Sequence, residues 1–74
     1  MDKTLFKLLN NYRDKRIKVR TRDGNLYEGI LKDFSESWHK GVGNLVLKEV
    51  YDSFKVYYRE VIIRGTEVCI IVFE

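Results

Sequence analysis

The feature that most constrains this chain is a change of hydrophobic period at about residue 16. From there Ile17 and Val19 alternate with cationic residues, and a period of two places alternate side chains on opposite faces of a β-strand. Residues 23–25 then read Asp-Gly-Asn, which is a strong turn signal. The pattern predicts a strand, a tight turn and a return strand, in a chain built largely of β-structure.

The rest of the chain divides into one short helix and four further segments. Leu5, Leu8 and Leu9 have the spacing of one helix face, and the predicted helix spans about residues 4–12. The predicted strands span about residues 16–22, 26–34, 44–50, 56–64 and 66–73. Gly29 lies inside the second strand, a position typical of a sharp bend or a close backbone approach. These features predict a small, strongly bent, five-stranded antiparallel barrel with an N-terminal α-helix, in one domain over residues 1–74.

Composition narrows the classes of function. The net charge of +3 permits nucleic-acid binding without requiring it. The last third of the chain is much more apolar than the rest, which indicates self-association because so small a domain would struggle to bury it. The single cysteine excludes an intrachain disulfide, and Cys69 is predicted to be an inert core residue.

Catalysis and membrane insertion have little support in the sequence. We find no Ser/His/Asp or Cys/His arrangement, no phosphate-cradling glycine loop and no Cys/His cluster suited to zinc. We therefore expect neither an enzyme nor a cofactor. The N-terminus has no long apolar run, so we expect no signal peptide or membrane span and a cytoplasmic location.

An Arg-Gly pair lies between two apolar segments near the end of the chain. Gly65 supplies the freedom for a tight reversal, and Arg64 is then held at a loop tip with its planar donor fork free to bind a phosphate, a base edge or a carboxylate. From these residues alone, an ordinary hairpin with a solvated arginine is the simpler interpretation.

Taken in order, these motifs resemble the Sm and Sm-like (Lsm) protein family, in its archaeal, homo-oligomeric type. The first family motif is similar to residues 17–50, with Asp23-Gly24, Tyr27-x-Gly29-x-Leu31, Phe34 and Asn44-Leu45-Val46-Leu47. The second is similar to residues 61–68, Val-Ile-Ile-Arg-Gly-Thr-Glu-Val. The resemblance covers nearly the whole chain and implies an Sm-like, SH3-like barrel.

The resemblance also implies a function. It implies a ring of six or seven copies that binds uridine-rich single-stranded RNA near its pore, as a ribonucleoprotein component in RNA processing. The fourth strand of one copy would pair with the fifth strand of the next. Asn44, Arg64 and Gly65 would be RNA-binding residues, since the amide and the guanidinium can read or stack on a base. The alternative is a small-barrel ring or assembly module that binds a protein partner and has no RNA function.

The chain departs from the family pattern in the loop before Asn44. Ser35 stands where the family usually has an acidic residue, and an apparent insertion of about five residues precedes Asn44. Simple offset from Asn44 places Val42 at the usual base-stacking position, and Val42 stacks poorly. Trp38 and His39 are the candidates to replace it. Equally, Trp38 can fold back over the open end of the barrel.

Two further clusters each allow two interpretations. Six cations fall within ten residues, namely Arg13, Lys15, Arg16, Lys18, Arg20 and Arg22. They form either a second RNA surface or, as we prefer, a solvated strand face. Four aromatic residues crowd the connection between the third and fourth strands, namely Tyr51, Phe54, Tyr57 and Tyr58. For these we prefer packing, including packing against a neighbouring subunit, over RNA stacking.

Overall fold

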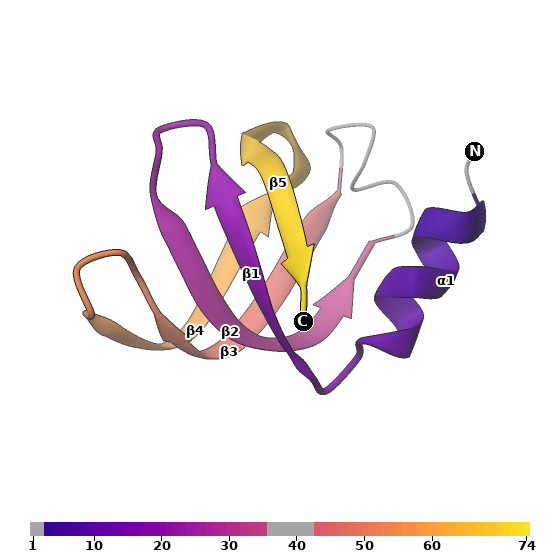
Figure 1. Ribbon diagram of the computed structural model, residues 1–74, viewed down its shortest axis with the longest axis horizontal. Helices are drawn as coiled ribbons and strands as arrows, with labels where there is room; N and C mark the ends of the chain where they lie inside the picture. The colour runs from indigo at the N-terminus through magenta and orange to yellow at the C-terminus, as the bar shows by residue number, and fades with distance from the viewer. Residues whose placement is uncertain (1–2, 36–42) are drawn as a thin grey trace.

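A short helix precedes five strands in the folded chain. The computed structural model describes residues 3–35 and 43–74 (Figure 1). The elements are α1 (Lys3–Asn11), β1 (Arg16–Thr21), β2 (Leu26–Phe34), β3 (Asn44–Tyr51), β4 (Tyr57–Arg64), the 3₁₀ turn η2 (Gly65–Glu67) and β5 (Val68–Phe73). The predicted fold class, mostly β with an N-terminal helix, is confirmed.

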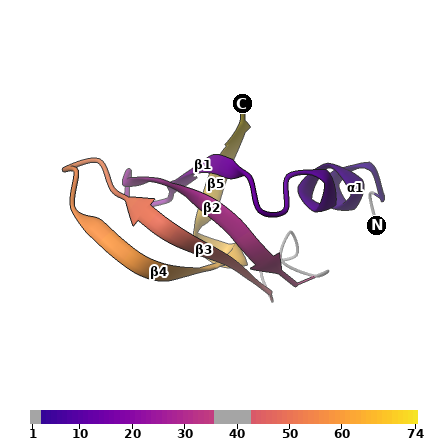
Figure 2. The same cartoon turned by 90° about the horizontal axis from the view of Figure 1, so that it is seen from below.

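The strands form one strongly bent sheet in the order β4-β3-β2-β1-β5 (Figure 2). Every neighbouring pair is antiparallel. Although β4 and β5 are consecutive in the chain, they lie at the two ends of this order, so the ordinary hairpin, which was the simpler interpretation of Arg64-Gly65 alone, is not formed. The 3₁₀ turn η2 carries the chain across instead, and β5 begins at Val68. Gly65 has no positive φ; among the described glycines only Gly24 has one.

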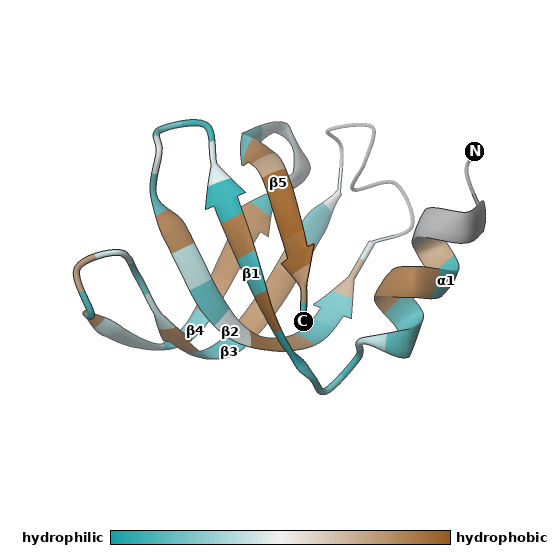
Figure 3. Ribbon diagram, viewed as in Figure 1, coloured by the Kyte–Doolittle hydropathy of each residue, from teal (hydrophilic) through white to brown (hydrophobic). Residues whose placement is uncertain are grey.

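The core lies inside the curve of the sheet. The alternation predicted along β1 is confirmed, because Ile17 and Val19 are buried while the intervening cations face outward. The buried hydrophobic side chains are Leu9, Ile17, Val19, Leu31, Phe34, Leu45, Leu47, Val50 and Ile63. Each such side chain contributes about 1.5–3 kcal/mol when fully buried. Figure 3 shows that hydrophobic residues continue along β5, where Ile70 and Val72 stay exposed.

The bend of the barrel depends on Gly29 and on a bulge in β3. Two residues of β2 span the same length as three of β3, because the pairing passes from Glu28–Tyr51 to Ile30–Lys48. Glu49 takes up the extra length with a φ of 54°. Gly29 lies against this bulge, and a Cβ placed there would be 2.8 Å from Val50 Cγ2. The close backbone approach predicted at Gly29 is confirmed.

Helix α1 packs against the core through one face. Leu9 is fully buried, and the Phe6 ring meets Phe34 edge-on with centroids 5.5 Å apart. Just after the helix, the Tyr12 ring lies 4.8 Å from that of Phe73 at the end of β5. The helix therefore contacts the end of β2, and the residue that follows it contacts the end of β5.

Cys69 is exposed on β5, so the prediction that it is a core residue is wrong. The register between β1 and β5 passes from Arg20–Ile70 to Thr21–Val68, which leaves Cys69 as the extra residue of a bulge. Two successive side chains, Cys69 and Ile70, are consequently exposed.

Candidate nucleic-acid interface

Asn44 and Arg64 are brought together as direct neighbours across two strands. Asn44 is the first residue of β3, Arg64 is the last of β4, and the two are paired in the register. Residues directly opposite in an antiparallel pair have Cβ atoms about 4.5–5.5 Å apart. Both side chains are exposed. An amide and a guanidinium thus stand side by side at one end of the barrel.

Backbone hydrogen bonds hold this strand end. The Gly65 N–H donates to the Gly43 carbonyl at 2.7 Å, and the Ser35 N–H donates to the Asn44 carbonyl at 3.0 Å. The Asn44 N–H donates to Ser35 Oγ at 3.3 Å. Both the backbone and the side chain of Ser35 therefore bond to the backbone of Asn44. The ends of β2, β3 and β4 meet here.

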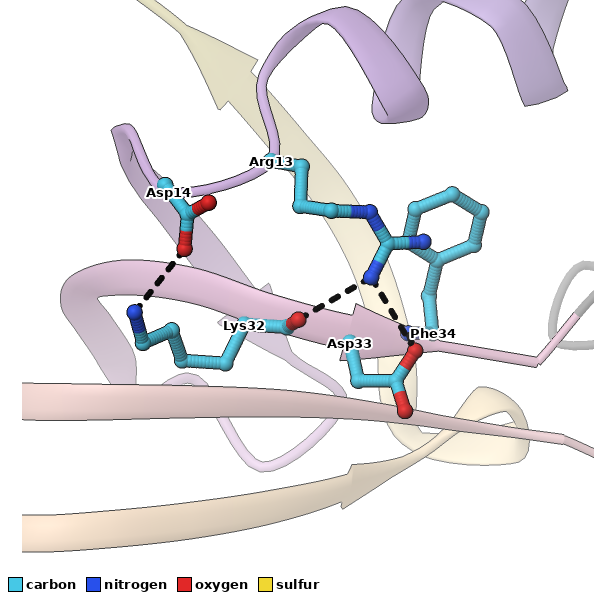
Figure 4. Close-up of polar contacts among 5 residues, drawn as sticks. All are labelled: Arg13, Asp14, Lys32, Asp33 and Phe34. Atoms are coloured by element: carbon cyan, nitrogen blue, oxygen red, sulfur yellow. Dashed lines mark hydrogen bonds and ion pairs between the residues drawn. The ribbon is translucent and has the colours of Figure 1, made fainter.

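A second group of contacts fixes the end of β2, from which the loop before Asn44 departs (Figure 4). Arg13 Nη1 donates to the Lys32 carbonyl at 3.0 Å and to Asp33 Oδ1 at 3.2 Å. The same guanidinium lies over the Phe34 ring, 4.8 Å from its centroid. Lys32 Nζ donates to Asp14 Oδ1 at 2.8 Å. These contacts tie the segment after α1 to β2, next to the candidate site.

The carboxylates in these contacts are held in their charged form. The hydrogen bond and charge of Lys32 keep the pKa of Asp14 below its ordinary value. The Phe34 backbone N–H, followed by the hydrogen bond and charge of Arg13, lowers the pKa of Asp33. The Asp33 carboxylate is thus bonded both to the Arg13 guanidinium and to the Phe34 backbone N–H.

A hollow of about 280 Å³ lies beside Arg64. Its lining residues are Thr21, Asp23, Tyr27, Val61, Ile62, Ile63, Arg64 and Glu67. This volume is just below the usual range of small-molecule pockets, so the hollow suits a group smaller than a drug-sized ligand. The Thr21 hydroxyl, followed by the Asn25 backbone N–H, lowers the pKa of Asp23, which keeps that wall of the hollow anionic.

Sequence reasoning missed the contribution of Thr21, Asp23 and Tyr27 to this region. The Asp-Gly-Asn signal at residues 23–25 was visible, but it indicates only a turn. The curvature of the sheet brings that turn close to the end of β4. The turn and β4 lie about forty residues apart in the chain, and local sequence patterns do not predict contacts at such a distance. Trp38 and His39 lie outside the described residues, as does Val42, and their assignment stays a prediction.

The basic row on β1 is partly engaged within the chain. Lys18 Nζ forms an ion pair with Glu74 at 2.8 Å, and the bond and charge of Glu74 raise the pKa of Lys18. Arg13 pairs with Asp33, and Lys15 Nζ lies 5.6 Å from the centroid of the Tyr12 ring. The row therefore contributes to the chain's own contacts, and whether it binds RNA stays a prediction.

Metal and membrane features are lacking over residues 3–35 and 43–74. Within these ranges no three His, Cys, Asp or Glu side chains are grouped so as to hold a metal ion. Nor does this part of the chain contain a helix with the length and apolarity needed to cross a membrane.

The bent five-stranded antiparallel sheet with a short N-terminal helix is the fold that this chain shares with solved Sm-like proteins. A family model described as the LSM domain matches residues 7–73. The chain belongs to the LSM domain family. No curated protein sequence matched it.

Archaeal Sm-like proteins are among the solved structures of similar fold. The SmAP1 heptamer of Pyrobaculum aerophilum is 25% identical, with a TM-score of 0.81 over 93% of this chain and 90% of the other. A second Sm-like protein of P. aerophilum is 21% identical, with a TM-score of 0.79 over 89% of this chain. This chain spans about half of that longer protein, 48% of its length. The Sm protein of Pyrococcus abyssii, solved with a uridine heptamer, is 21% identical (TM-score 0.77) over 90% and 93% of the two chains.

Proposed function

We propose that this chain assembles into a homo-oligomeric ring of six or seven copies that binds uridine-rich single-stranded RNA near its pore. The observation that carries the proposal is the pairing of Asn44 with Arg64 at exposed strand ends, next to the Gly43–Gly65 hydrogen bond. The related P. aerophilum protein is a heptamer, and the related P. abyssii protein was solved with a uridine heptamer. We further propose that the ring acts in RNA processing in the cytoplasm.

The sheet order supports assembly. β4 and β5 are the two edge strands, and an exposed edge presents backbone groups that another chain can pair with. Both carry exposed apolar side chains, with Ile62 at 61%, Ile70 at 52% and Val72 at 42% exposure. Pairing β4 of one copy with β5 of the next covers both edges and closes a ring. Each RNA site is then repeated around the pore, which raises the overall affinity.

The site residues have separate roles in this proposal. The Asn44 amide supplies a donor and an acceptor to a uracil edge, and the Arg64 guanidinium stacks on the base or contacts phosphate. Gly65 lets the backbone approach the RNA. Trp38 or His39 supplies the stacking ring. No step of catalysis is proposed, in keeping with membership of the LSM domain family.

The test is RNA affinity measured by fluorescence anisotropy, with oligo-uridine against oligo-adenosine at two salt concentrations. Asn44→Ala and Arg64→Ala should each cost on the order of 1–3 kcal/mol, a 5- to 150-fold loss of affinity for oligo-uridine. Arg64→Ala should also reduce the salt dependence, because it removes a cation, whereas Asn44→Ala should not. Trp38→Ala belongs in the same series and should weaken binding by about 1–3 kcal/mol per stacked base.

Arg59→Ala is the matched control. Arg59 is an exposed arginine on the same strand as Arg64, near the opposite end of β4. If Arg64→Ala loses no more affinity than Arg59→Ala, and Asn44→Ala binds like the parent, the assigned site is wrong. A parent ring that binds neither oligonucleotide favours the other candidate, an assembly module for a protein partner.

A further inference from the structure

Strand β2 contains a bulge at Lys32, close to its end. Between Leu31 and Asp33 the strand advances by two residues while its partner on β3 changes by only one. A bulge of this kind interrupts the ladder of backbone hydrogen bonds and changes the facing of the residues that follow it. The register beyond the bulge, including the contact of Ser35 with Asn44, therefore depends on how the bulge is held.

The segment that follows α1 lies against this bulge. The Asp14 N–H donates to the Leu31 carbonyl at 2.7 Å, and the Leu31 N–H donates to the Lys15 carbonyl at 2.9 Å. Arg13 Nη1 donates to the Lys32 carbonyl at 3.0 Å. Two backbone hydrogen bonds thus hold the residue before the bulge, and the Arg13 side chain holds the carbonyl of the bulged residue itself.

The Arg13 guanidinium contacts three successive residues of β2 (Figure 4). Besides the Lys32 carbonyl, it bonds to Asp33 Oδ1 at 3.2 Å and lies over the Phe34 ring, 4.8 Å from the ring centroid. A planar guanidinium can donate through its edge and stack through its face at the same time, whereas the compact ammonium of a lysine cannot. Arg13 therefore fixes the positions of these three residues relative to one another.

The same contacts argue against Arg13 as a ligand for an RNA phosphate. The charge of Arg13 is offset by the Asp33 carboxylate, which forms an ion pair with it and is itself mostly exposed. A phosphate that approached the guanidinium would meet this carboxylate as well and would be repelled by it. Phosphate affinity comes from cations that replace the counterions of RNA, and a cation already paired within the chain contributes less to it.

The contacts continue from the bulge to Asn44. Phe34, the last residue of β2, pairs with Leu45 of β3. The Ser35 N–H donates to the Asn44 carbonyl at 3.0 Å, and the Asn44 N–H donates to Ser35 Oγ at 3.3 Å. Asn44 in turn lies opposite Arg64. Movement at the bulge would therefore move the Asn44 backbone relative to Arg64.

We infer that Arg13 is a positioning residue for the RNA site: it holds the bulge at Lys32 and thereby sets the placement of Asn44, without contacting RNA itself. This inference rests on the RNA binding of the proposed function. It gives the first cation of the basic row a role different from that of a solvated residue or a phosphate ligand. Disturbing a packed, hydrogen-bonded network of this kind changes binding at a coupled site by roughly 2- to 30-fold.

The experiment measures oligo-uridine affinity of the full chain by fluorescence anisotropy over a series of salt concentrations, with the folded state of each variant checked by thermal unfolding. Arg13→Ala should weaken binding by roughly 2- to 30-fold and leave the salt dependence unchanged, because no phosphate contact is lost. Arg13→Lys should lose nearly as much, although it keeps the charge. Arg16→Ala is the matched control: Arg16 is exposed at the start of β1, has no side-chain hydrogen bond or ion pair among the described residues, and its variant should bind like the parent.

A double-mutant cycle separates positioning from an independent contribution to binding. In a chain that already carries Asn44→Ala, Arg13→Ala should cause little further loss, because its effect acts through Asn44. Amide hydrogen exchange supplies a measurement that needs no RNA. The N–H groups of Ser35 and Asn44, which join the two strand ends, should exchange faster in Arg13→Ala than in the parent and in Arg16→Ala.

Several outcomes overturn the inference. One is an Arg13→Ala variant that binds oligo-uridine like the parent, and another is a loss that is equally large with and without Asn44→Ala. A reduced salt dependence in Arg13→Ala, with parent-like binding by Arg13→Lys, assigns Arg13 to the RNA backbone instead. A parent that binds neither oligo-uridine nor oligo-adenosine overturns the proposed function. In that case faster exchange at the two amides still supports Arg13 as the residue that positions this strand end, and unchanged exchange overturns that role too.

Discussion

Replacing Gly29 with alanine tests how closely β2 and β3 approach at the bend of the barrel. The added Cβ would lie 2.8 Å from Val50 Cγ2, 3.0 Å from the Lys48 carbonyl oxygen and 3.3 Å from Val50 Cα. Val50 is fully buried, so its side chain has no space to move into. The other two atoms belong to the β3 backbone, which is paired to β4 at both residues. The alanine therefore separates the strands or strains the core.

The expected cost follows from these contacts. Overpacking of a well-packed interior costs about 1–3 kcal/mol, and two rigid backbone contacts place Gly29→Ala in the upper part of that range. For a domain of this size a loss of about 2–3 kcal/mol lowers the melting temperature by roughly 10–20 °C. Because β3 begins at Asn44, a shifted β3 should also weaken the proposed RNA binding.

Urea and thermal unfolding of parent and variant, at equal protein concentration and with the assembly state measured, provide the assay. Gly24→Asn is the control: Gly24 has a φ of 90° with no atom within 4 Å of an added Cβ, and asparagine tolerates positive φ, so the loss should be under about 1 kcal/mol. Combining Gly29→Ala with Val50→Ala should cost less than the sum of the two, since the shortest contact is removed. A Gly29→Ala variant within about 0.5 kcal/mol of the parent would refute the close approach.

Two further predictions concern assembly and pH. Ile62→Asp should dissociate the ring in light scattering, because this side chain on edge strand β4 would place an unpaired carboxylate against the β5 of the next copy; a variant of unchanged mass contradicts the β4–β5 contact. The pKa values of Asp14 and Asp33 are lowered by folding, so the stability that they contribute is present above the unfolded value of about 4 and is lost as the pH falls through the lowered values. Asp14→Asn and Asp33→Asn should therefore lower the melting temperature at neutral pH and converge with the parent in acid; equal losses at both pH values would exclude the charge as the cause.

The sequence by itself determined the elements of this fold, because their signals are local. The two-residue alternation of β1, the Asp-Gly-Asn turn and the position of Gly29 each depend on neighbouring residues, and the observed strands begin and end close to the predicted limits. The ordered motifs also singled out Asn44 and Arg64. Family resemblance selected that pair, since neither residue is distinctive alone.

The tertiary structure alone decided how those elements combine. The register between β3 and β4 placed Asn44 opposite Arg64. That register depends on the turn around Asp52 and on the positions of the bulges. One such bulge exposes Cys69, which its apolar neighbours had suggested was buried. The strand order put β4 and β5 at separate edges, and the curvature of the sheet brought Asp23 of the turn to the same hollow as Arg64. These relations join residues distant in the chain, and hydrophobic period carries information only about near neighbours.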